Sequence, residues 1–394
     1  MATVSWDGAA PGGRLRHRRE AIATASTLAG RFADTMTMCG LTRETTSAAG
    51  VSGEMSPTCY HVELGGTPYL MVRLVPGQVI DDFTDNLARI AAGLGVERVE
   101  IEQRRQEVLR IWLNPVDPLA QPFEVPAPVS SGTHPVTFGR LETGRPVVES
   151  LDTMGMLACQ GQTRGGKSSW SYGLLRQVSG ASEIEVSGID PTGKLLGPWD
   201  DGHPQGVDLC TSSDYTAMEK TSQLLVEEMR DRIAKIPRDE DKLGPGSGVP
   251  LRLVVLEEWA DALTIASIAK NKANGRDTEL GRNIATLLSQ SHKARMRVVM
   301  LCQRFDAALV GGFNRNNFSH AITFRTRSKD GVQLLHESCP DHIAQRHATE
   351  KPGIALVETP TVPLQRMLAP GARSYRSYVE AVDASRPGAQ PAAA

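Results

Sequence analysis

Short apolar runs alternate with longer amphipathic segments through residues 130–375. Runs in which nearly every residue is apolar are typical of strands that are buried on both faces of a sheet. They occur at residues 154–160, 184–190, 252–257, 298–303 and 321–326. Segments that suit helices lie between them, at residues 169–178, 213–236 and 280–295. This alternation predicts an α/β fold in which a mostly parallel sheet carries helices on both faces. A hairpin at residues 137–140 and 146–149 should precede the sheet, and residues 353–358 should add an edge strand.

Residues 58–114 show a different pattern, in which apolar and polar positions alternate. Strands are predicted at residues 59–64, 69–74, 96–103 and 107–113, with a helix at residues 81–94. This pattern is typical of a small α+β module. Residues 114–129 contain five prolines and mark its end.

The first residues of the chain carry a basic cluster, Arg14-Leu-Arg-His-Arg-Arg19. A helix is expected at about residues 20–39, and the Ser-, Thr-, Ala- and Gly-rich residues 42–53 suggest a linker. The cluster could contact nucleic acid or anionic lipid, but a solvated or disordered arm is the simpler interpretation.

The patterns divide the chain into four parts. Residues 1–53 form a basic arm, a helix and a linker, and residues 54–129 form the small α+β domain with its proline-rich linker. Residues 130–375 form the α/β domain. Residues 376–394 are expected to be a disordered tail, because the chain from Ser385 onward is rich in proline and alanine.

Composition limits the possible partners and location. A length of 394 residues suits two or three domains, and a net charge of −2 gives no global attraction to nucleic acid. The six cysteines contain no C-x-x-C pair, which predicts reduced thiols in a cytoplasmic protein. No apolar stretch approaches the roughly 18 to 20 residues of a membrane span. Action at a membrane would therefore need a partner protein to recruit this chain.

Residues 161–168 match the phosphate-binding pattern G-x-x-x-x-G-K-[ST] between a predicted strand and a predicted helix. Glycines allow consecutive backbone N–H groups to point at a phosphate, and the N-terminus of the helix adds a favourable dipole. Lys167 would reach the β- and γ-phosphates, and the Ser168 hydroxyl would bind Mg²⁺. The predicted nucleotide-binding residues are Gly161, Gln162, Thr163, Arg164, Gly165, Gly166, Lys167, Ser168 and Ser169.

A pair of carboxylates, Glu257 and Glu258, ends the predicted strand at residues 252–257. Two glutamates at a strand end are common on protein surfaces. Their position about 90 residues after the phosphate loop, with one predicted strand between, favours a catalytic role instead. Glu257 would hold Mg²⁺ through water, and Glu258 would polarise the water that attacks the γ-phosphate.

Later strands supply further polar candidates. Gln303 could sense the γ-phosphate or orient water, or it could simply leave the core at the end of its strand. Arg325 and Arg327 lie on the last core strand, from which an arginine could reach the nucleotide of a neighbouring subunit. Arg325 is the one that we select as this catalytic arginine.

Two other clusters are ambiguous. Residues 267–297 are locally basic, with Lys270, Lys272, Arg276, Arg282, Lys293, Arg295 and Arg297 against Asp277 and Glu279. They could follow a phosphate backbone or form a solvated helix face. His336, Cys339, His342 and His347 fit no zinc spacing, and we expect no metal there.

With these residues in place, the chain resembles the FtsK/SpoIIIE-type DNA translocases over about residues 58–370. The phosphate loop, Val255-Leu-Glu-Glu-Trp-Ala-Asp261, Leu301-Cys-Gln-Arg304 and Ile322-Thr-Phe-Arg-Thr-Arg-Ser-Lys329 carry the resemblance. Phe138-Gly-Arg140 and Gly188-Ile-Asp-Pro191 are similar to the actinobacterial plasmid-transfer (TraB/TraSA-like) branch.

The resemblance implies a RecA-like P-loop NTPase that hydrolyses ATP with Mg²⁺ and moves double-stranded DNA as a hexameric ring, in conjugative transfer. It assigns Glu258 as catalytic base, Gln303 as sensor and Arg325 as the arginine that acts between subunits. Two residues depart from the pattern, since Glu257 replaces an aspartate and Cys302 replaces a threonine. The chain also has no recognisable winged-helix domain or membrane segment. Type VII secretion ATPases, which act on protein, resemble this family too. A scaffold that binds ATP without turnover is the remaining alternative.

Overall fold

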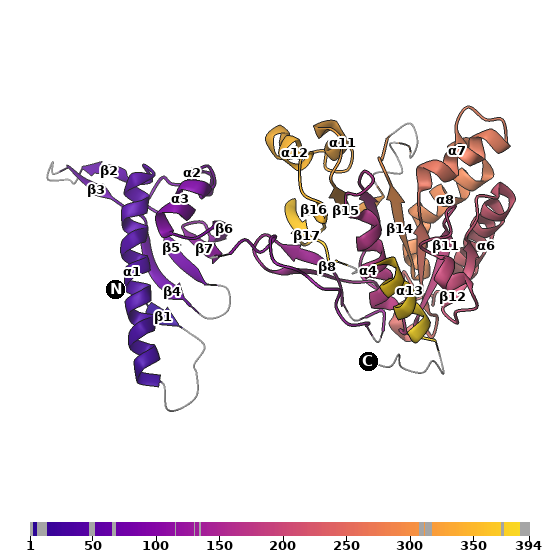
Figure 1. Cartoon of the computed structure of the whole chain (residues 1–394), viewed down its shortest axis with the longest axis horizontal. Helices are drawn as coiled ribbons and strands as arrows, with labels where there is room; N and C mark the ends of the chain where they lie inside the picture. Colours follow the sequence, from indigo (N-terminus) through magenta and orange to yellow (C-terminus); the bar gives the residue numbers. More distant parts are fainter. Residues whose placement is uncertain are drawn as a thin grey trace. The chain divides into compact units, whose positions relative to one another are not determined.

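The computed structural model describes residues 3–5, 14–46, 52–64, 68–114, 116–129, 131–133, 135–306, 311, 317–371 and 374–386. The chain divides into two compact units between Gln121 and Pro122, and each unit is described by itself (Figure 1). Within these described ranges, no helix is long and apolar enough to span a lipid bilayer.

The smaller unit contains a five-stranded sheet with helices against one face. The strands follow the order β1 (Thr3–Ser5), β4 (Thr58–Glu63), β5 (Tyr69–Arg73), β7 (Val108–Asn114) and β6 (Arg98–Arg105). The helices are α1 (Arg14–Met38), α2 (Ile80–Thr84) and α3 (Leu87–Leu94). Leu70 of β5 and Ile111 of β7 lie opposite each other on paired strands. Alternate residues of a strand point to the same face of the sheet, and on this face Leu70 and Ile111 share one core with Phe32 of α1 and Ile90 of α3.

Three expectations for this unit are wrong in detail. The expected linker contains an antiparallel hairpin of β2 (Arg43–Thr46) and β3 (Ser52–Met55), in which adjacent threonines favour extended backbone. The predicted helix at residues 81–94 is broken between α2 and α3, where the Asn86 side chain donates to the Asp82 carbonyl at 2.9 Å. Helix α1 begins within the basic cluster, whose Arg and Leu residues are good helix formers.

The larger unit is built on a ten-stranded sheet in the order β12-β11-β13-β14-β10-β15-β16-β17-β8-β9. The parallel strands are β12 (Gly206–Cys210), β11 (Ile184–Ile189), β13 (Leu251–Leu256), β14 (Met296–Cys302), β10 (Met156–Gln160) and β15 (Phe318–Phe324). The antiparallel strands are β16 (Ile354–Glu358), β17 (Gln365–Leu368), β8 (Pro135–Leu141) and β9 (Pro146–Ser150). This mostly parallel α/β architecture confirms the predicted fold class.

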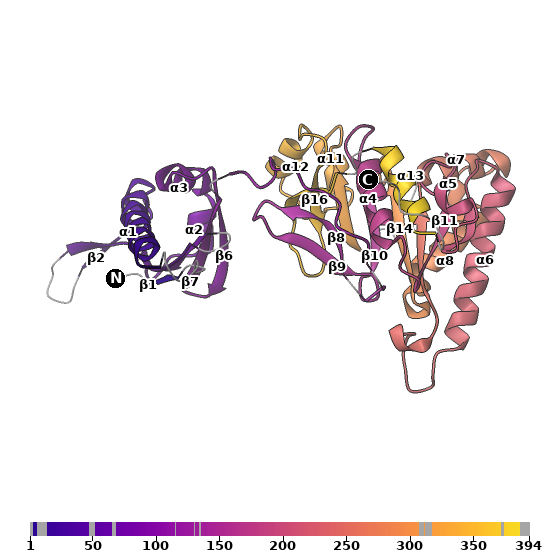
Figure 2. The same ribbon diagram turned by 60° about the horizontal axis from the view of Figure 1, so that its bottom comes forward.

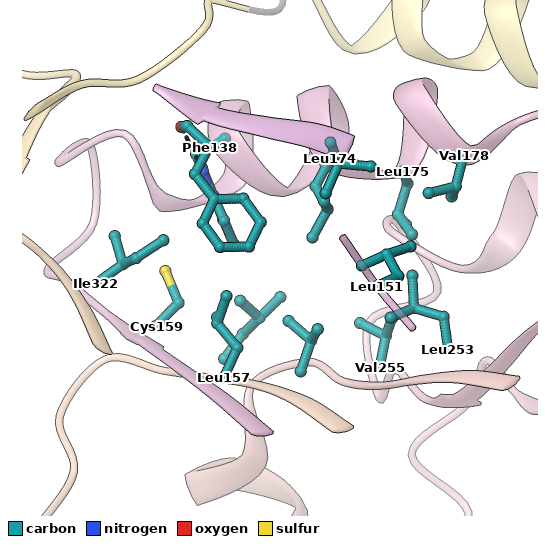
Figure 3. Packing of buried hydrophobic residues seen from close by; sticks show 14 of the residues in the cluster. Phe138, Leu151, Leu157, Cys159, Leu174, Leu175, Val178, Leu253, Val255 and Ile322 are labelled. Atoms are coloured by element: carbon teal, nitrogen blue, oxygen red, sulfur yellow. Dashed lines mark hydrogen bonds between the residues drawn. The ribbon is translucent and has the colours of Figure 1, made fainter. Parts of the chain in front are cut away.

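Helices cover both faces of this sheet (Figure 2). One face carries α4 (Lys167–Val178), α5 (Gly197–Asp200) and α13 (Tyr375–Ala384), and the other carries α6 (Tyr215–Ala234), α7 (Trp259–Ala269) and α8 (Glu279–Gln290). Shorter helices are η1 (Pro245–Ser247), η2 (Gly275–Asp277), η3 (Ser291–Ala294), α11 (Lys329–Gln333) and α12 (Asp341–His347). Figure 3 shows Leu174 and Val178 of α4 above Leu157 and Val255 of the sheet. This packing fixes the start of α4 at the edge where the parallel strands end.

Four features of the larger unit differ from expectation. Strands β12 and β17 were not predicted, because both are short and most of their residues are only half-buried. Residues 353–358 do form a strand, but β17 pairs beyond it, so β16 lies inside the sheet. Residues 376–386 are not disordered, because Tyr378 and Val382 of α13 are fully buried in the core. Residues 387–394 of the expected tail lie outside the described residues.

Candidate nucleotide-binding site

The loop between β10 and α4 is fixed by glycines and by backbone hydrogen bonds. Gly166 has a φ of 121°, which side chains disfavour, and a Cβ added there would lie 2.9 Å from the backbone nitrogen of Gly353. The Gly353 N–H donates to the Gly165 carbonyl at 2.9 Å, and the Gln162 N–H donates to the Arg325 carbonyl at 2.9 Å. Helix α4 begins at the next residue after the loop, so its free N-terminal N–H groups lie at the loop.

A cavity of about 440 Å³ opens over this loop. Its lining includes Gly161, Gln162, Thr163, Arg164, Gly166, Lys167, Ser168 and Ser169, all of them predicted to bind nucleotide. Gly165 is buried and does not line the cavity. Glu258, Gln303, Pro352 and Gly353 complete the lining. The phosphate loop after β10, Glu258 after β13 and Gln303 after β14 therefore line one cavity.

Two carboxylates contact the lysine of the loop. Lys167 Nζ lies 3.3 Å from Glu257 Oε1 and 3.0 Å from Glu258 Oε1. The Glu257 N–H donates to the Ile189 carbonyl at 2.9 Å, which fixes the end of β13 against β11. Glu258 has a φ of 43°, in the left-handed region that residues with side chains rarely adopt. This strained turn separates the directions of two consecutive carboxylates while both reach the lysine.

Burial and charge act against each other in this cluster. Burial raises the pKa of Glu257 to about 7, the nearby charge of Lys167 lowers it, and the carboxylates of Glu258 and Asp190 raise it further. Burial lowers the pKa of Lys167, but its two carboxylate neighbours outweigh that effect and raise it. Lys167 therefore keeps its positive charge, and Glu257 holds its proton more tightly than an exposed glutamate.

The donor atoms suit Mg²⁺. Glu257 Oε2 is buried and accepts no hydrogen bond from any residue that the structure describes, which is costly for a carboxylate oxygen without another partner. Ser168 presents an exposed hydroxyl at the mouth of the cavity. Carboxylate and hydroxyl oxygens are the hard ligands that Mg²⁺ prefers. These residues therefore fit the predicted cation.

Gln160 is a buried residue next to the phosphate loop, and no sequence motif assigned it a role. Gln160 Nε2 donates to Thr323 Oγ1 at 3.1 Å and to the Gly331 carbonyl at 2.7 Å. Its Oε1 accepts from the Phe305 N–H at 3.1 Å. Gln160 thus fixes the chain two residues after Gln303. A polar residue at the end of an apolar run, just before the loop, was the available signal.

Asp190 is a second buried group that was assigned no role. Its Oδ2 accepts from the Leu195 and Leu196 N–H groups at 2.7 and 3.0 Å. Its Oδ1 accepts from the N–H of Thr192 at 3.0 Å and from that residue's hydroxyl at 2.8 Å. The carboxylate therefore shapes the turn after β11, beside Glu257. Its position at the end of an apolar strand resembles that of Glu257 and could have identified it.

Neither arginine proposed to act between subunits reaches the cavity of its own chain. Arg325 is half-buried and uses its carbonyl to hold the loop, and its side chain is not part of the lining. Arg327 is exposed and lines an adjoining hollow of about 380 Å³ with Thr163 and Gln303.

The basic segment at residues 267–297 loses two of its members to the core. Arg295 Nε donates to Asp152 Oδ1 at 2.7 Å, and Arg297 Nη2 donates to the Asp152 carbonyl at 2.5 Å. Both arginines are buried. They cannot follow a phosphate backbone, so the interpretation of the whole segment as a nucleic-acid track is wrong for these two residues.

His336, Cys339 and His347 are buried and serve packing, whereas His342 is exposed. His336 Nδ1 lies 2.9 Å from Glu358 Oε2, and His347 Nε2 lies 2.8 Å from the Thr323 carbonyl. Cys339 is buried. In the described part of the chain, no group of three or more His, Cys, Asp or Glu residues is arranged to hold a metal ion.

No family model matches the chain. It is 24% identical over 230 residues to "Protein Tra" of Streptomyces lividans, a match that covers 55% of this chain and 35% of that protein. The chain thus spans about a third of the length of this curated relative.

Two solved structures share the fold. One is the pCW3 conjugation coupling protein TcpA, a monomer form with ATPγS, with a TM-score of 0.52 and 15% identity over 90% of this chain and 99% of that one. The other is EssC (ATPases 2 and 3) from Geobacillus thermodenitrificans, with a TM-score of 0.53 and 17% identity over 69% of this chain and 51% of that one. The chain therefore has the fold of P-loop ATPases and, as its motifs predicted, resembles the plasmid-transfer branch of the FtsK/SpoIIIE-type proteins.

Proposed function

We propose that this protein hydrolyses ATP and uses the energy to move double-stranded DNA in conjugative transfer of a plasmid or an integrative element. The working form would be a ring of identical chains, a hexamer. One observation carries the ATPase part of the proposal. The lysine of the phosphate loop lies 3.3 Å from one buried carboxylate and 3.0 Å from a second, beside a buried carboxylate oxygen that lacks a partner among the described residues.

Each residue has a distinct part in nucleotide binding. The backbone N–H groups at the start of α4 would hold the phosphates, and Lys167 would turn from the carboxylates to the β- and γ-phosphates. Ser168 and Glu257 would hold Mg²⁺, Glu257 through water. When bound, the cation neutralises phosphate charge. The positive charge of the cation would then replace that of Lys167 beside Glu257.

Glu258 would act as the general base. Its carboxylate accepts a proton from water, the water oxygen forms a bond to the γ-phosphorus, and the bond to the bridging oxygen of ADP breaks. Gln303 lies in the same cavity, where its amide would orient that water or sense the phosphate. Arg325 of a neighbouring chain would stabilise the charge that develops on the transferred group.

The proposal that the cargo is DNA rests on similarity to other proteins. The protein from Streptomyces lividans is a Tra protein, and TcpA is a conjugation coupling protein. Both names favour DNA transfer. EssC keeps open an alternative in which the same architecture acts on protein.

Location and partners belong to the same proposal. All six cysteines are free thiols, which suits the reducing cytoplasm. A partner protein of the transfer machinery would bring the ring to the membrane.

The test measures the ATPase rate of the full chain with and without duplex DNA. We expect DNA to raise turnover, and we expect Lys167→Ala and Glu258→Gln to abolish it. Arg376→Ala is the matched control, because the Arg376 side chain is 88% exposed and pairs with Glu380 on the surface. Turnover that ignores duplex DNA but rises with a secreted protein substrate would favour the EssC-like alternative. Wild-type turnover no faster than that of Glu258→Gln would favour the scaffold.

A further inference from the structure

Three tyrosines from two helices gather beside the phosphate loop. The rings of Tyr172 on α4 and Tyr378 on α13 are stacked, with centroids 4.8 Å apart and planes inclined by 17°. Tyr375, the first residue of α13, lies 5.5 Å from Tyr172 and 6.2 Å from Tyr378. Figures 1 and 2 both show α13 alongside α4. The roles assigned above do not use any of these rings.

The innermost tyrosine connects this cluster to the catalytic edge of the sheet. Tyr378 is 1% exposed, its hydroxyl donates to the Leu195 carbonyl at 2.5 Å, and it accepts from Trp199 Nε1 at 2.7 Å. The Leu195 N–H in turn donates to the buried carboxylate of Asp190. Tyr378 is therefore held rigidly, and the rings of Tyr172 and Tyr375 pack against it.

The outer ring has room for a ligand. Tyr375 is 40% exposed and is among the few large hydrophobic side chains that stand out from the described surface. Burial raises the pKa of both Tyr172 and Tyr375, and the carboxylate of Asp190 raises it further in each case.

The spacing of residues along α4 relates this cluster to the phosphate loop. Tyr172 follows Lys167 by five residues, which corresponds to a rise of about 7.5 Å along the helix. It also follows Ser169, which lines the cavity, by three residues, and residues at this spacing share one side of a helix. Tyr172 therefore lies on the side of α4 that carries Ser169.

We propose that Tyr375, supported by Tyr172, is the base-binding end of the nucleotide site and stacks on the purine of a nucleoside triphosphate. This inference rests on the proposed nucleotide binding. The ligand class is a purine nucleotide, because a flat aromatic ring binds an exposed tyrosine through its face. Helix α13 thereby becomes part of the site.

The test compares ATP with inorganic tripolyphosphate, each with Mg²⁺, by calorimetric titration of the full chain. Tripolyphosphate carries the charges that the loop binds but has no base. A lost base–aromatic stack is worth about 1–3 kcal/mol, so Tyr375→Ala should weaken ATP binding by about 5- to 150-fold. Its affinity for tripolyphosphate should stay unchanged, and Tyr375→Phe should keep both affinities.

Arg376→Ala is the matched control, since the Arg376 side chain is 88% exposed on the same helix and pairs only with Glu380 in the described structure. It should bind both ligands like the wild type. Unchanged ATP affinity in Tyr375→Ala overturns the inference, and so does an equal loss for both ligands, which indicates a structural defect. Wild-type protein that binds neither ligand refutes the proposed function itself, and the inference with it.

Discussion

The buried histidine His347 predicts how the stability of the larger unit depends on pH. Its side chain lies under the end of β15, is 2% exposed, and donates from Nε2 to the Thr323 carbonyl at 2.8 Å. Burial lowers the pKa of His347 to about 4, an effect that the hydrogen bond to Thr323 only partly opposes. Glu350 raises this pKa, and His336 lowers it. The folded chain therefore keeps His347 neutral at pH values where the unfolded chain protonates it.

The sign and size follow from proton linkage. The unfolded imidazole binds a proton below its ordinary pKa of about 6.5, while the folded one does so only near 4. The neutral state contributes stability that is fully present above pH 6.5 and is lost as the pH falls toward 4. The loss is about 2 kcal/mol at pH 5 and about 3 kcal/mol at its limit. For a unit of this size, 2 kcal/mol corresponds to roughly 4 to 8 °C in Tm.

The assay is thermal unfolding at pH 7 and pH 5 of the wild type and of His347→Gln, whose amide can still donate to Thr323. The variant should lose about 2 kcal/mol less than the wild type over this interval. His342→Gln, at an exposed position of the same helix, is the control and should follow the wild type. Parallel losses in wild type and His347→Gln would refute the reasoning.

Three further predictions concern a glycine of the phosphate loop, the buried Asp152–Arg295 ion pair and the buried Gln160. Gly166→Ala should weaken ATP binding by about 5- to 150-fold through backbone strain of about 1–3 kcal/mol, whereas Gly244→Ala, with open space around its Cβ, should bind ATP normally in the same titration. Asp152→Ala leaves Arg295 buried without its carboxylate and should cost about 3–5 kcal/mol in urea unfolding, while the exposed Asp341→Ala should cost at most about 1 kcal/mol. Gln160→Leu should lower the ATPase rate more than ATP affinity, as steady-state kinetics would show, because Gln160 fixes the chain after Gln303.

Much of the larger unit could be predicted because its signals are local. An apolar run such as residues 298–303 must be buried on both sides, and the glycines and lysine of residues 161–168 have few other uses. The expected hairpin before the sheet is present as β8 and β9. Its place in the sheet was not predictable, because it joins through β17, a strand of four residues of which only Met367 is fully buried.

The errors arise where distant contacts decide the local structure. Residues 375–384 look like the start of a polar tail, yet they form a helix in which the Tyr378 hydroxyl is hydrogen-bonded to Trp199 of α5 and to the Leu195 carbonyl, roughly 180 residues earlier in the chain. Arg295 and Arg297 look like surface charges, but Asp152 binds both in the core. No pattern within a short window contains these partners.

In the site, too, local motifs predicted the residues, whereas their contacts depend on distant parts of the chain. These contacts suggest why nucleotide and cation should bind together. Sequence motifs predicted the residues, but they could not show that Lys167 contacts both Glu257 and Glu258. ATP alone would draw the lysine away and leave Glu257 buried without compensation, which is costly. Mg²⁺ alone would meet the positive charge of that lysine. Only the two together supply a partner for every charge, since the phosphates take the lysine while the cation takes the carboxylate. Under the proposed function, the buried pair would therefore favour binding of the Mg²⁺ complex of ATP over binding of either ligand alone.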